Sequence, residues 1–248
     1  MKYYAVADVH GYFDTLKTTL DANGFFTDTD FHKLIVCGDL FDRGKQAVDL
    51  QGFILNLLEQ NEVILIKGNH EDLALDLLNG WPKRSYFQYH HHTNGTIDTV
   101  LQLTESTMHD LLNTPEDVGE KFLQSPFIQR IIPAMCDYYE TSHYIFVHGW
   151  IPCENQLYRR DWRFVDENMW NKARWLNGME AAHAGVIEPN KTIVCGHWHC
   201  SFGHARYEGK GGEFDNNPDF TPYYNTGIIA LDACTPVSGK INCIVIED

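Results

Sequence analysis

Two carboxylates and a guanidinium follow one apolar run near the start of the chain. Residues 34–37 are apolar, Asp39 and Asp42 come just beyond them, and Arg43 is next. Carboxylates this close together can ligate a divalent cation, and a guanidinium fork can bind an oxyanion beside it. Two carboxylates do not complete a metal site, so other segments must supply the remaining ligands.

Four further apolar runs also end in side chains that can bind a metal. These side chains are Asp8 and His10 after residues 3–7, Asn69 after residues 63–66, His148 after residues 144–147, and both His197 and His199 after residues 192–195. One histidine after a strand is more often structural than a ligand, but five such strand ends are hard to explain by chance. Mixed imidazole and oxygen ligands suit Mn, Fe, Zn or Ni. Two cations that share Asp39 could hold both the attacking and the leaving oxygen of a displacement at phosphorus.

The apolar runs predict buried strands, and amphipathic segments follow the early ones. Residues 12–20 and 48–60 carry apolar residues at helical spacing, which predicts a helix after each of the first two strands. Strand, loop and helix in succession indicate an α/β fold with a parallel sheet. Right-handed crossovers keep the carboxyl ends of such strands on one side, so the loops that carry the metal-binding side chains can converge there.

The rest of the chain predicts fewer regular elements. We expect helices at residues 115–123 and 169–183, and strands at residues 228–231 and 241–246 with a turn at residues 237–240. At about residues 80–142 we expect a helical insertion beside the cleft, within a single domain of residues 1–248. In this insertion His90, His91 and His92 could bind a metal, but an exposed turn before Asn94-Gly95 is the better interpretation. Residues 94–96 are also candidates to approach the cleft.

Composition limits the possible partners and the location of the protein. The net charge of −15 disfavours binding to nucleic acid or to an anionic membrane, because both depend on an excess of Lys and Arg. No apolar run approaches the roughly 20 residues that span a bilayer, and the first residues lack the pattern of a signal peptide. We therefore expect a cytoplasmic protein. Its seven cysteines include no CxxC pair, which argues against a disulfide framework or a zinc ribbon.

Five short motifs resemble, in order, those of the calcineurin-like metallophosphoesterases. They are Asp8-Val9-His10-Gly11, Gly38-Asp39-Leu40-Phe41-Asp42-Arg43-Gly44, Gly68-Asn69-His70-Glu71, Val147-His148-Gly149 and Gly196-His197-Trp198-His199. The second and third motifs are similar to those of the serine/threonine phosphoprotein phosphatase branch, particularly its small bacterial and phage members. The resemblance implies an α/β fold of the metallophosphoesterase type, a four-layer αββα sandwich.

The resemblance also implies two divalent metal ions as cofactors. Manganese is the foremost candidate, and iron, zinc and nickel are alternatives. The ligand sets that it implies are Asp8, His10 and Asp39 for one ion, with His199 as a further candidate, and Asp39, Asn69, His148 and His197 for the other.

Roles for the remaining motif residues follow from the same resemblance. His70 would be the general acid and Asp42 would orient it, since a histidine needs a carboxylate partner to stay protonated near neutral pH. Arg43 and Asn69 would bind the phosphoryl group. Arg174 resembles a second phosphate-binding arginine, with a solvated helix charge as the alternative. Trp150 stands where the branch usually has a small residue, and it could narrow the cleft floor or offer a stacking face.

The function that the resemblance implies is metal-dependent hydrolysis of phosphomonoesters by direct attack of a hydroxide that bridges two metal ions. The substrate would be phosphoserine or phosphothreonine in a phosphorylated protein, or a small phosphoester. A second hypothesis on the same fold is a hydrolase of dinucleoside polyphosphates or nucleotide phosphodiesters. An inactive phosphate-binding scaffold is a third, but the presence of Asp39, His70 and His148 disfavours it.

Overall fold

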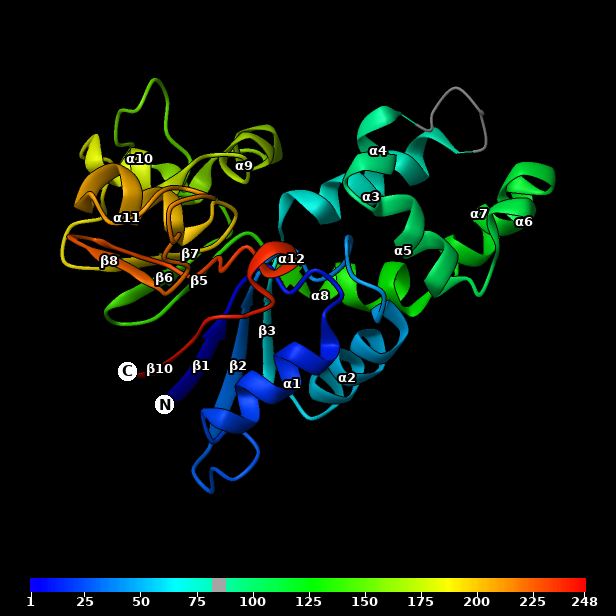
Figure 1. The fold of residues 1–248 in the computed structure, drawn as a ribbon, viewed down its shortest axis with the longest axis horizontal. Coiled ribbons are helices and arrows are strands. Elements are labelled where there is room, and N and C mark those ends of the chain that lie inside the picture. The colour runs from blue at the N-terminus through cyan, green and yellow to red at the C-terminus, as the bar shows by residue number, and fades with distance from the viewer. Residues whose placement is uncertain (82–87) are drawn as a thin grey trace.

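The computed structural model describes residues 1–81 and 88–248, and it contains two five-stranded β-sheets (Figure 1). The first sheet has the order β10 (Cys243–Glu247), β1 (Lys2–Val6), β2 (His32–Cys37), β3 (Val63–Ile66) and β4 (Met135–Cys136). The second has the order β5 (Tyr139–Glu140), β6 (Tyr144–Phe146), β7 (Thr192–Cys195), β9 (Ile228–Ala230) and β8 (Tyr223–Asn225).

The interior strands of both sheets are parallel, and antiparallel strands flank them. β1, β2, β3 and β4 pair in parallel, and β10 is antiparallel to β1. In the second sheet β6, β7 and β9 are parallel, and β5 and β8 are the antiparallel edges. The carboxyl ends of β1, β2 and β3 therefore lie at one edge, as the sequence predicted.

Three hydrophobic clusters separate four layers of secondary structure. Side chains alternate between the faces of each strand, so Tyr4 and Val6 pack with helices while Tyr3 and Ala5 face the other way. The cluster that contains Tyr3 and Ala5 also contains Phe146 of the second sheet, so it lies between the two sheets. A third cluster joins the outer face of the second sheet to its helices. This confirms the predicted α/β class and the αββα sandwich.

The helices that cover the sheets follow the strands in sequence. α1 (Phe13–Ala22) and α2 (Ala47–Glu59) cover the first sheet, and α10 (Gly178–His183) and α11 (Cys200–Glu208) lie beside the second (Figure 1). The inner faces of α1 and α2 bury Leu16, Leu20, Leu50 and Ile54 in the core. Among the described residues, no helix has the length and apolar character needed to cross a membrane.

A group of helices lies between β3 and β4 in sequence and to one side of the first sheet in Figure 1. It comprises α3 (Asn69–Gly80), α4 (Tyr89–Thr93), α5 (Thr96–Leu103), α6 (Met108–Asn113), α7 (Pro115–Leu123), a π-helical turn (Phe127–Ile131) and α8 (Ile132–Ala134). Ile97 and Val100 of α5 pack in the same core as α1 and α2. Residues 82–87 of the expected insertion are outside the described part. That this group is an insertion in a single domain stays a prediction.

The single helix that was predicted at residues 169–183 is wrong, because the chain forms two helices there. α9 (Glu167–Ala173) ends before α10 begins, and Asn177 caps α10 by accepting hydrogen bonds from the backbone N–H groups of Met179 (3.0 Å) and Glu180 (3.2 Å). A side chain at Gly178 would come within 2.6 Å of the Trp150 ring. The Asn-Gly pair therefore starts a new helix against that ring.

Other local predictions also fail. Trp150 is 1% exposed and its indole N–H donates to the Val186 carbonyl at 2.8 Å, so it is a core residue and offers no stacking face. The three consecutive histidines lie in α4 and not in an exposed turn, since His91 is buried. The turn predicted at residues 237–240 overlaps a short helix, α12 (Thr235–Ser238). In addition, a 3-10 turn that was not predicted occupies Trp162–Phe164.

Candidate metal centre

Four of the seven predicted ligands have an unusual backbone conformation at the strand ends. Asp8, His10, Asp39 and His197 have φ values between 51° and 67°, the left-handed region that residues other than glycine seldom adopt. Such strain costs on the order of 1–3 kcal/mol per residue and tends to cluster at functional sites. The loops therefore hold these side chains in place at the expense of local stability.

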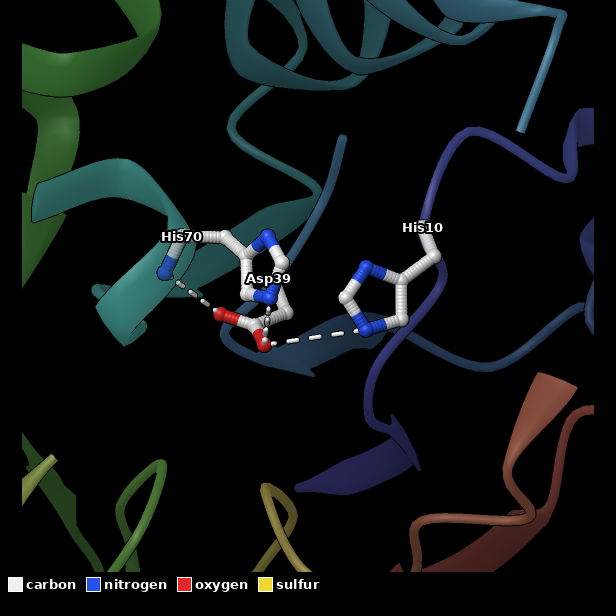
Figure 2. Close-up of side chains that lie close together, drawn as sticks. All are labelled: His10, Asp39 and His70. Carbon is white, nitrogen blue, oxygen red and sulfur yellow. Dashed lines mark hydrogen bonds and ion pairs between the residues drawn. The ribbon is translucent and has the colours of Figure 1, made fainter. Parts of the chain in front are cut away.

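The first group of potential ligands consists of His10, Asp39 and His70. Figure 2 shows the Asp39 carboxylate beside both imidazoles, with dashed lines that join it to each residue. The Oδ2 atom of Asp39 is 3.7 Å from His10 Nε2 and 3.8 Å from His70 Nε2. The Nδ1 atom of His10 is 2.9 Å from the Phe41 carbonyl, which can only accept a hydrogen bond. Nδ1 therefore carries the proton, and Nε2 presents its lone pair to the centre.

The second group consists of Asp39, His148 and His197. The Oδ1 atom of Asp39 is 3.3 Å from His148 Nε2, and His148 Nδ1 donates to the Cys37 carbonyl at 2.8 Å. In both groups the ligand atoms lie within 4.8 Å of one another. Asp39 thus offers Oδ2 to one group and Oδ1 to the other, so it could supply a ligand atom to a metal ion held by either group.

Asn69 supports the fit of this site to a cation. Its Oδ1 atom is 2.8 Å from His148 Nε2. With His148 Nδ1 at the Cys37 carbonyl, its Nε2 and the amide oxygen of Asn69 face each other as two potential ligand atoms, and a cation beside them could bind both. Neutral imidazoles, a carboxylate and an amide oxygen are suitable ligands for a first-row divalent metal. The side chains present therefore fit the metal ions that the sequence implied.

The ionisation of the ligands also suits metal binding. Burial lowers the pKa of His10 well below its ordinary value, and burial with the neighbouring His148 lowers the pKa of His197 to about 3. Burial raises the pKa of Asp39, but the surrounding histidines, His148 first, outweigh it and leave the pKa below its ordinary value. Metal ligation needs neutral imidazole and ionised carboxylate, and the site holds both.

Asp8 and His199 are in neither group. Asp8 is 1% exposed, and its carboxylate accepts the His197 backbone N–H at 3.0 and 3.1 Å. Burial, and then the charge of Asp232, raise the pKa of Asp8 well above its ordinary value. A cation bound beside Asp8 would lower this pKa again. His199 Nε2 is 2.7 Å from Glu213 Oε1. The ligand roles of Asp8 and His199 stay predictions.

His70 and Asp42 form a buried pair beside the metal ligands. His70 Nδ1 lies 2.7 Å from Asp42 Oδ2, and both residues are at most 3% exposed. Burial opposes protonation, but Asp39 and Asp42 outweigh it and raise the pKa of His70 above its ordinary value. The exposed Arg43 donates from Nη2 to His70 Nε2 at 3.3 Å. The structure thus brings together three of the residues that were predicted to act on the phosphoryl group, His70, Asp42 and Arg43.

The structure does not bring Arg174 to this group. Its side chain is 2% exposed, and its guanidinium pairs with Asp72 (2.8 Å), with Glu167 (3.1 Å) and with Asp137. The alternative interpretation as a solvated helix charge is therefore wrong. Phosphate binding by Arg174 would require it to leave three carboxylates, and it stays a prediction.

Several residues of the site were missed from the sequence. Glu71 is 1% exposed and accepts the backbone N–H groups of Gly68 (2.7 Å), Leu40 (2.9 Å) and Asp39 (3.1 Å), so it fixes the loops after β2 and β3. Its position directly after the Asn69-His70 pair was the available signal. Asp232 is buried close enough to Asp8 to raise its pKa. Thr99 was also missed, and it binds Asp42 from α5 together with Thr96, which was among the residues expected to approach the cleft.

Comparison with known proteins places this site in a family. A sequence model of the calcineurin-like phosphoesterases matches residues 1–201. The serine/threonine-protein phosphatase 2 of Escherichia coli is 38% identical over 73 residues, 29% of this chain and 31% of that protein. The symmetrical bis(5'-nucleosyl)-tetraphosphatase of Neisseria meningitidis is 36% identical over 87 residues, 34% of this chain and 30% of that protein.

Longer matches agree with this assignment. The asymmetrical bis(5'-nucleosyl)-tetraphosphatase PrpE of Bacillus subtilis is 27% identical over 130 residues, and the match covers 50% of this chain and 49% of that protein. The matched segments thus cover less than half of each of these three relatives. The cold-active protein-tyrosine phosphatase of a Shewanella species shares the fold, with a TM-score of 0.52 and 18% identity over 100% of this chain and 75% of that one. Because the family match spans most of its length, the chain belongs to the calcineurin-like phosphoesterase family.

Proposed function

We propose that this protein is a metal-dependent phosphomonoesterase that removes phosphate from phosphoserine or phosphothreonine in proteins. The observation that carries this proposal is the position of Asp39, whose two oxygens face separate histidine groups. Beside Asp39, a buried acid pair and an exposed arginine lie where a phosphoryl group would bind. A two-metal site with an acid and an anion-binding group is what hydrolysis of a phosphate ester requires.

The metal ions in this proposal are divalent, with manganese preferred over iron, zinc and nickel. Asp8, His10 and Asp39 would hold one ion, with His199 as a further candidate, and Asp39, Asn69, His148 and His197 would hold the other. When bound, such ions supply positive charge to the phosphoryl group and lower the pKa of a water molecule that attacks phosphorus.

The other residues bind the phosphoryl group and move one proton. Arg43 binds phosphoryl oxygens with its planar fork, and the amide of Asn69 assists it. His70 gives the proton on Nε2 to the leaving oxygen, while Asp42 keeps its hydrogen bond to Nδ1. In the present arrangement Arg43 donates to His70 Nε2, so Nε2 carries no proton; before His70 can act as an acid, binding of phosphate would have to draw Arg43 away and Nε2 would have to take up a proton.

A second candidate substrate is a dinucleoside polyphosphate. It is supported by the tetraphosphatases among the relatives, as the phosphoprotein substrate is supported by serine/threonine-protein phosphatase 2. The net charge of −15 favours the phosphomonoester, because a tetraphosphate carries more negative charge toward an acidic protein. Cytoplasmic location, and the absence of nucleic-acid or membrane partners, are part of the same proposal.

A substrate panel with defined metal content tests these candidates. We expect the manganese-loaded protein to hydrolyse phosphoserine or phosphothreonine peptides faster than diadenosine tetraphosphate, and a chelator to abolish the activity. Cleavage of diadenosine tetraphosphate alone would overturn the phosphoprotein proposal. A protein that binds two metal ions and cleaves neither substrate would be a phosphate-binding scaffold.

A further inference from the structure

One face of helix α5 binds the loop that carries Asp42 and Arg43. Thr96, Thr99 and Gln102 lie three residues apart on this face and all bond to the loop. The bonds run from Thr96 Oγ1 to Asp42 Oδ2 (2.8 Å), from Thr99 Oγ1 to Asp42 Oδ1 (2.7 Å) and from Gln102 Nε2 to the Gly44 carbonyl (3.1 Å). Since Ile97 and Val100 of the same helix are buried in the core, α5 is a fixed support for the loop.

These bonds use both oxygens of the Asp42 carboxylate. Oδ2 accepts from Thr96 and from His70, while Oδ1 accepts from Thr99. Thr99 also accepts the backbone N–H of Asp42 at 3.0 Å, which makes a reciprocal pair. All four residues are at most 3% exposed, so water has little access to replace a lost bond. A carboxylate without such anchors rotates broadly about its terminal torsion, and here both threonines prevent that rotation.

The start of α5 also touches the backbone of Arg43. Gly95 precedes the helix with φ of 88°, and a Cβ there would lie 2.4 Å from the backbone nitrogen of Arg43. No other residue type fits this contact without displacing Arg43. Residues 95–99 therefore set the positions of both Asp42, which orients His70, and Arg43, which contacts it.

We propose that Thr96 and Thr99 are positioning residues that keep Asp42 aligned with His70 for proton transfer. The inference rests on the proposed phosphomonoesterase function and extends it to α5. As water attacks and forms a new bond to phosphorus, the bond from phosphorus to the leaving oxygen breaks and its electrons stay on that oxygen, which takes the proton from His70 Nε2. Asp42 gains no proton, because its role is to hold Nδ1–H and the ring orientation. Misalignment of Asp42 therefore weakens proton donation and leaves the metal ligands in place.

Dependence on the leaving group separates this role from a general structural one. An ester of a poor leaving group needs the proton, whereas 2,4-dinitrophenolate leaves without it. In manganese-loaded Thr99→Val, we expect kcat for phenyl phosphate to fall roughly tenfold, a part of the roughly 10²–10⁴-fold that general acid catalysis supplies. We expect kcat for 2,4-dinitrophenyl phosphate, and KM for both, to stay within about twofold of wild type. Thr99→Ser keeps the hydroxyl and should restore the rate.

Two further variants complete the test. Thr96→Val removes one bond and leaves no backbone N–H unpaired, so it should show the same selective loss even if Thr99→Val fails to fold. Thr104→Val is the matched control, because the hydroxyl of Thr104 is buried near the end of the same helix and donates to the Val100 carbonyl at 2.7 Å. It should hydrolyse both esters at the wild-type rate.

The outcomes distinguish the inference from the function on which it rests. An equal loss with both esters, a loss of metal by elemental analysis, or no loss with phenyl phosphate in either valine variant would overturn the positioning role. If the wild-type protein holds two metal ions but hydrolyses neither ester, the proposed function itself fails.

Discussion

The metal centre and the acid pair lie side by side but are supported by different parts of the fold. The metal-binding side chains come from strand ends in both sheets, where the strained backbone and Glu71 fix the loops. The Asp42–His70 pair depends in addition on α5, a helix outside both sheets. The proposed metal binding and the proposed proton delivery should therefore be separable by mutation, because different parts of the fold support the two groups of residues.

The largest effect should come from Asp39, which belongs to both ligand groups. Asp39→Asn replaces one carboxylate oxygen by an NH2 group, which cannot ligate, and removes the negative charge, so we expect loss of both metal ions. Activity should fall by more than about 10³-fold, since the rate enhancement depends on those ions. Elemental analysis and phosphatase assays measure the two effects. Asp49→Asn, at an aspartate in the first turn of α2, is the control, and two ions retained in Asp39→Asn would disprove the bridging role.

A smaller effect, limited to the acid, should follow from His70→Asn. The variant removes the proton donor, so turnover of phenyl phosphate should fall by roughly 10²–10⁴. Both metal ions should remain, because neither of the two proposed ligand sets includes His70, although its Nε2 lies 3.8 Å from Asp39 Oδ2. Kinetics with phenyl and 2,4-dinitrophenyl phosphate, together with metal analysis, test this, and His109→Asn on the surface is the control. Full activity on phenyl phosphate would show that His70 is not the general acid. Loss of metal would show that the metal centre and the Asp42–His70 pair are not separable.

The sequence predicted the metal centre better than the support of the acid. Each metal-capable residue follows an apolar run, so local pattern together with parallel pairing brings those residues to one edge. The bonds from Thr96 and Thr99 to Asp42 join segments 54 and 57 residues apart, and no local pattern specifies them. Strands of two or three residues, such as β4, β5 and β8, were missed because they are too short to show a period.

The sequence also did not predict the direction in which the side chains of Trp150 and Arg174 point. Trp150 follows His148-Gly149 directly, yet it packs inward under α10, where Gly178 leaves room for its ring. Arg174 was identified as a phosphate ligand or a solvated charge, and neither describes its contacts with Asp72, Asp137 and Glu167. Both outcomes depend on packing between distant segments, which residue types along the chain do not fix.

Arg174 offers a test of whether a second arginine belongs to the phosphate site. From its contacts we expect Arg174→Met to lower the free energy of unfolding by about 2 kcal/mol, less than for a fully buried pair because Glu167 is half exposed. KM for phosphomonoesters should stay within about twofold of wild type. Urea unfolding and steady-state kinetics measure both quantities, and Arg130→Met, which breaks a single exposed pair with Glu59, is the control. A rise in KM with unchanged stability would make Arg174 a phosphate ligand.

The smallest effect concerns an ion-pair cluster outside both regions, on β5. Arg163 binds Glu140 through Nε (2.8 Å) and Nη2 (2.6 Å), and Lys191 adds a bond of 2.8 Å. These partners, Arg163 first, lower the pKa of Glu140 from 4.5 to about 2. The ionised carboxylate therefore stabilises the folded protein at pH values above about 4.5, and this contribution is lost as the pH falls toward 2.

Glu140→Gln should therefore cost about 1 kcal/mol of unfolding free energy at pH 7, after allowance for solvent screening of the 23% exposed side chain. The difference from wild type should shrink between pH 4.5 and pH 3, as urea unfolding at several pH values would show. Glu59→Gln, which removes an exposed pair with Arg130, should change stability by less than about 0.5 kcal/mol at any pH. If the difference in unfolding free energy between wild type and Glu140→Gln were the same at pH 3 as at pH 7, the ion pairs of Glu140 would not be the source of the stabilisation. Unchanged kcat in Glu140→Gln would show that a stability loss of this size does not by itself alter turnover, so that the selective losses expected for the α5 variants report on proton delivery.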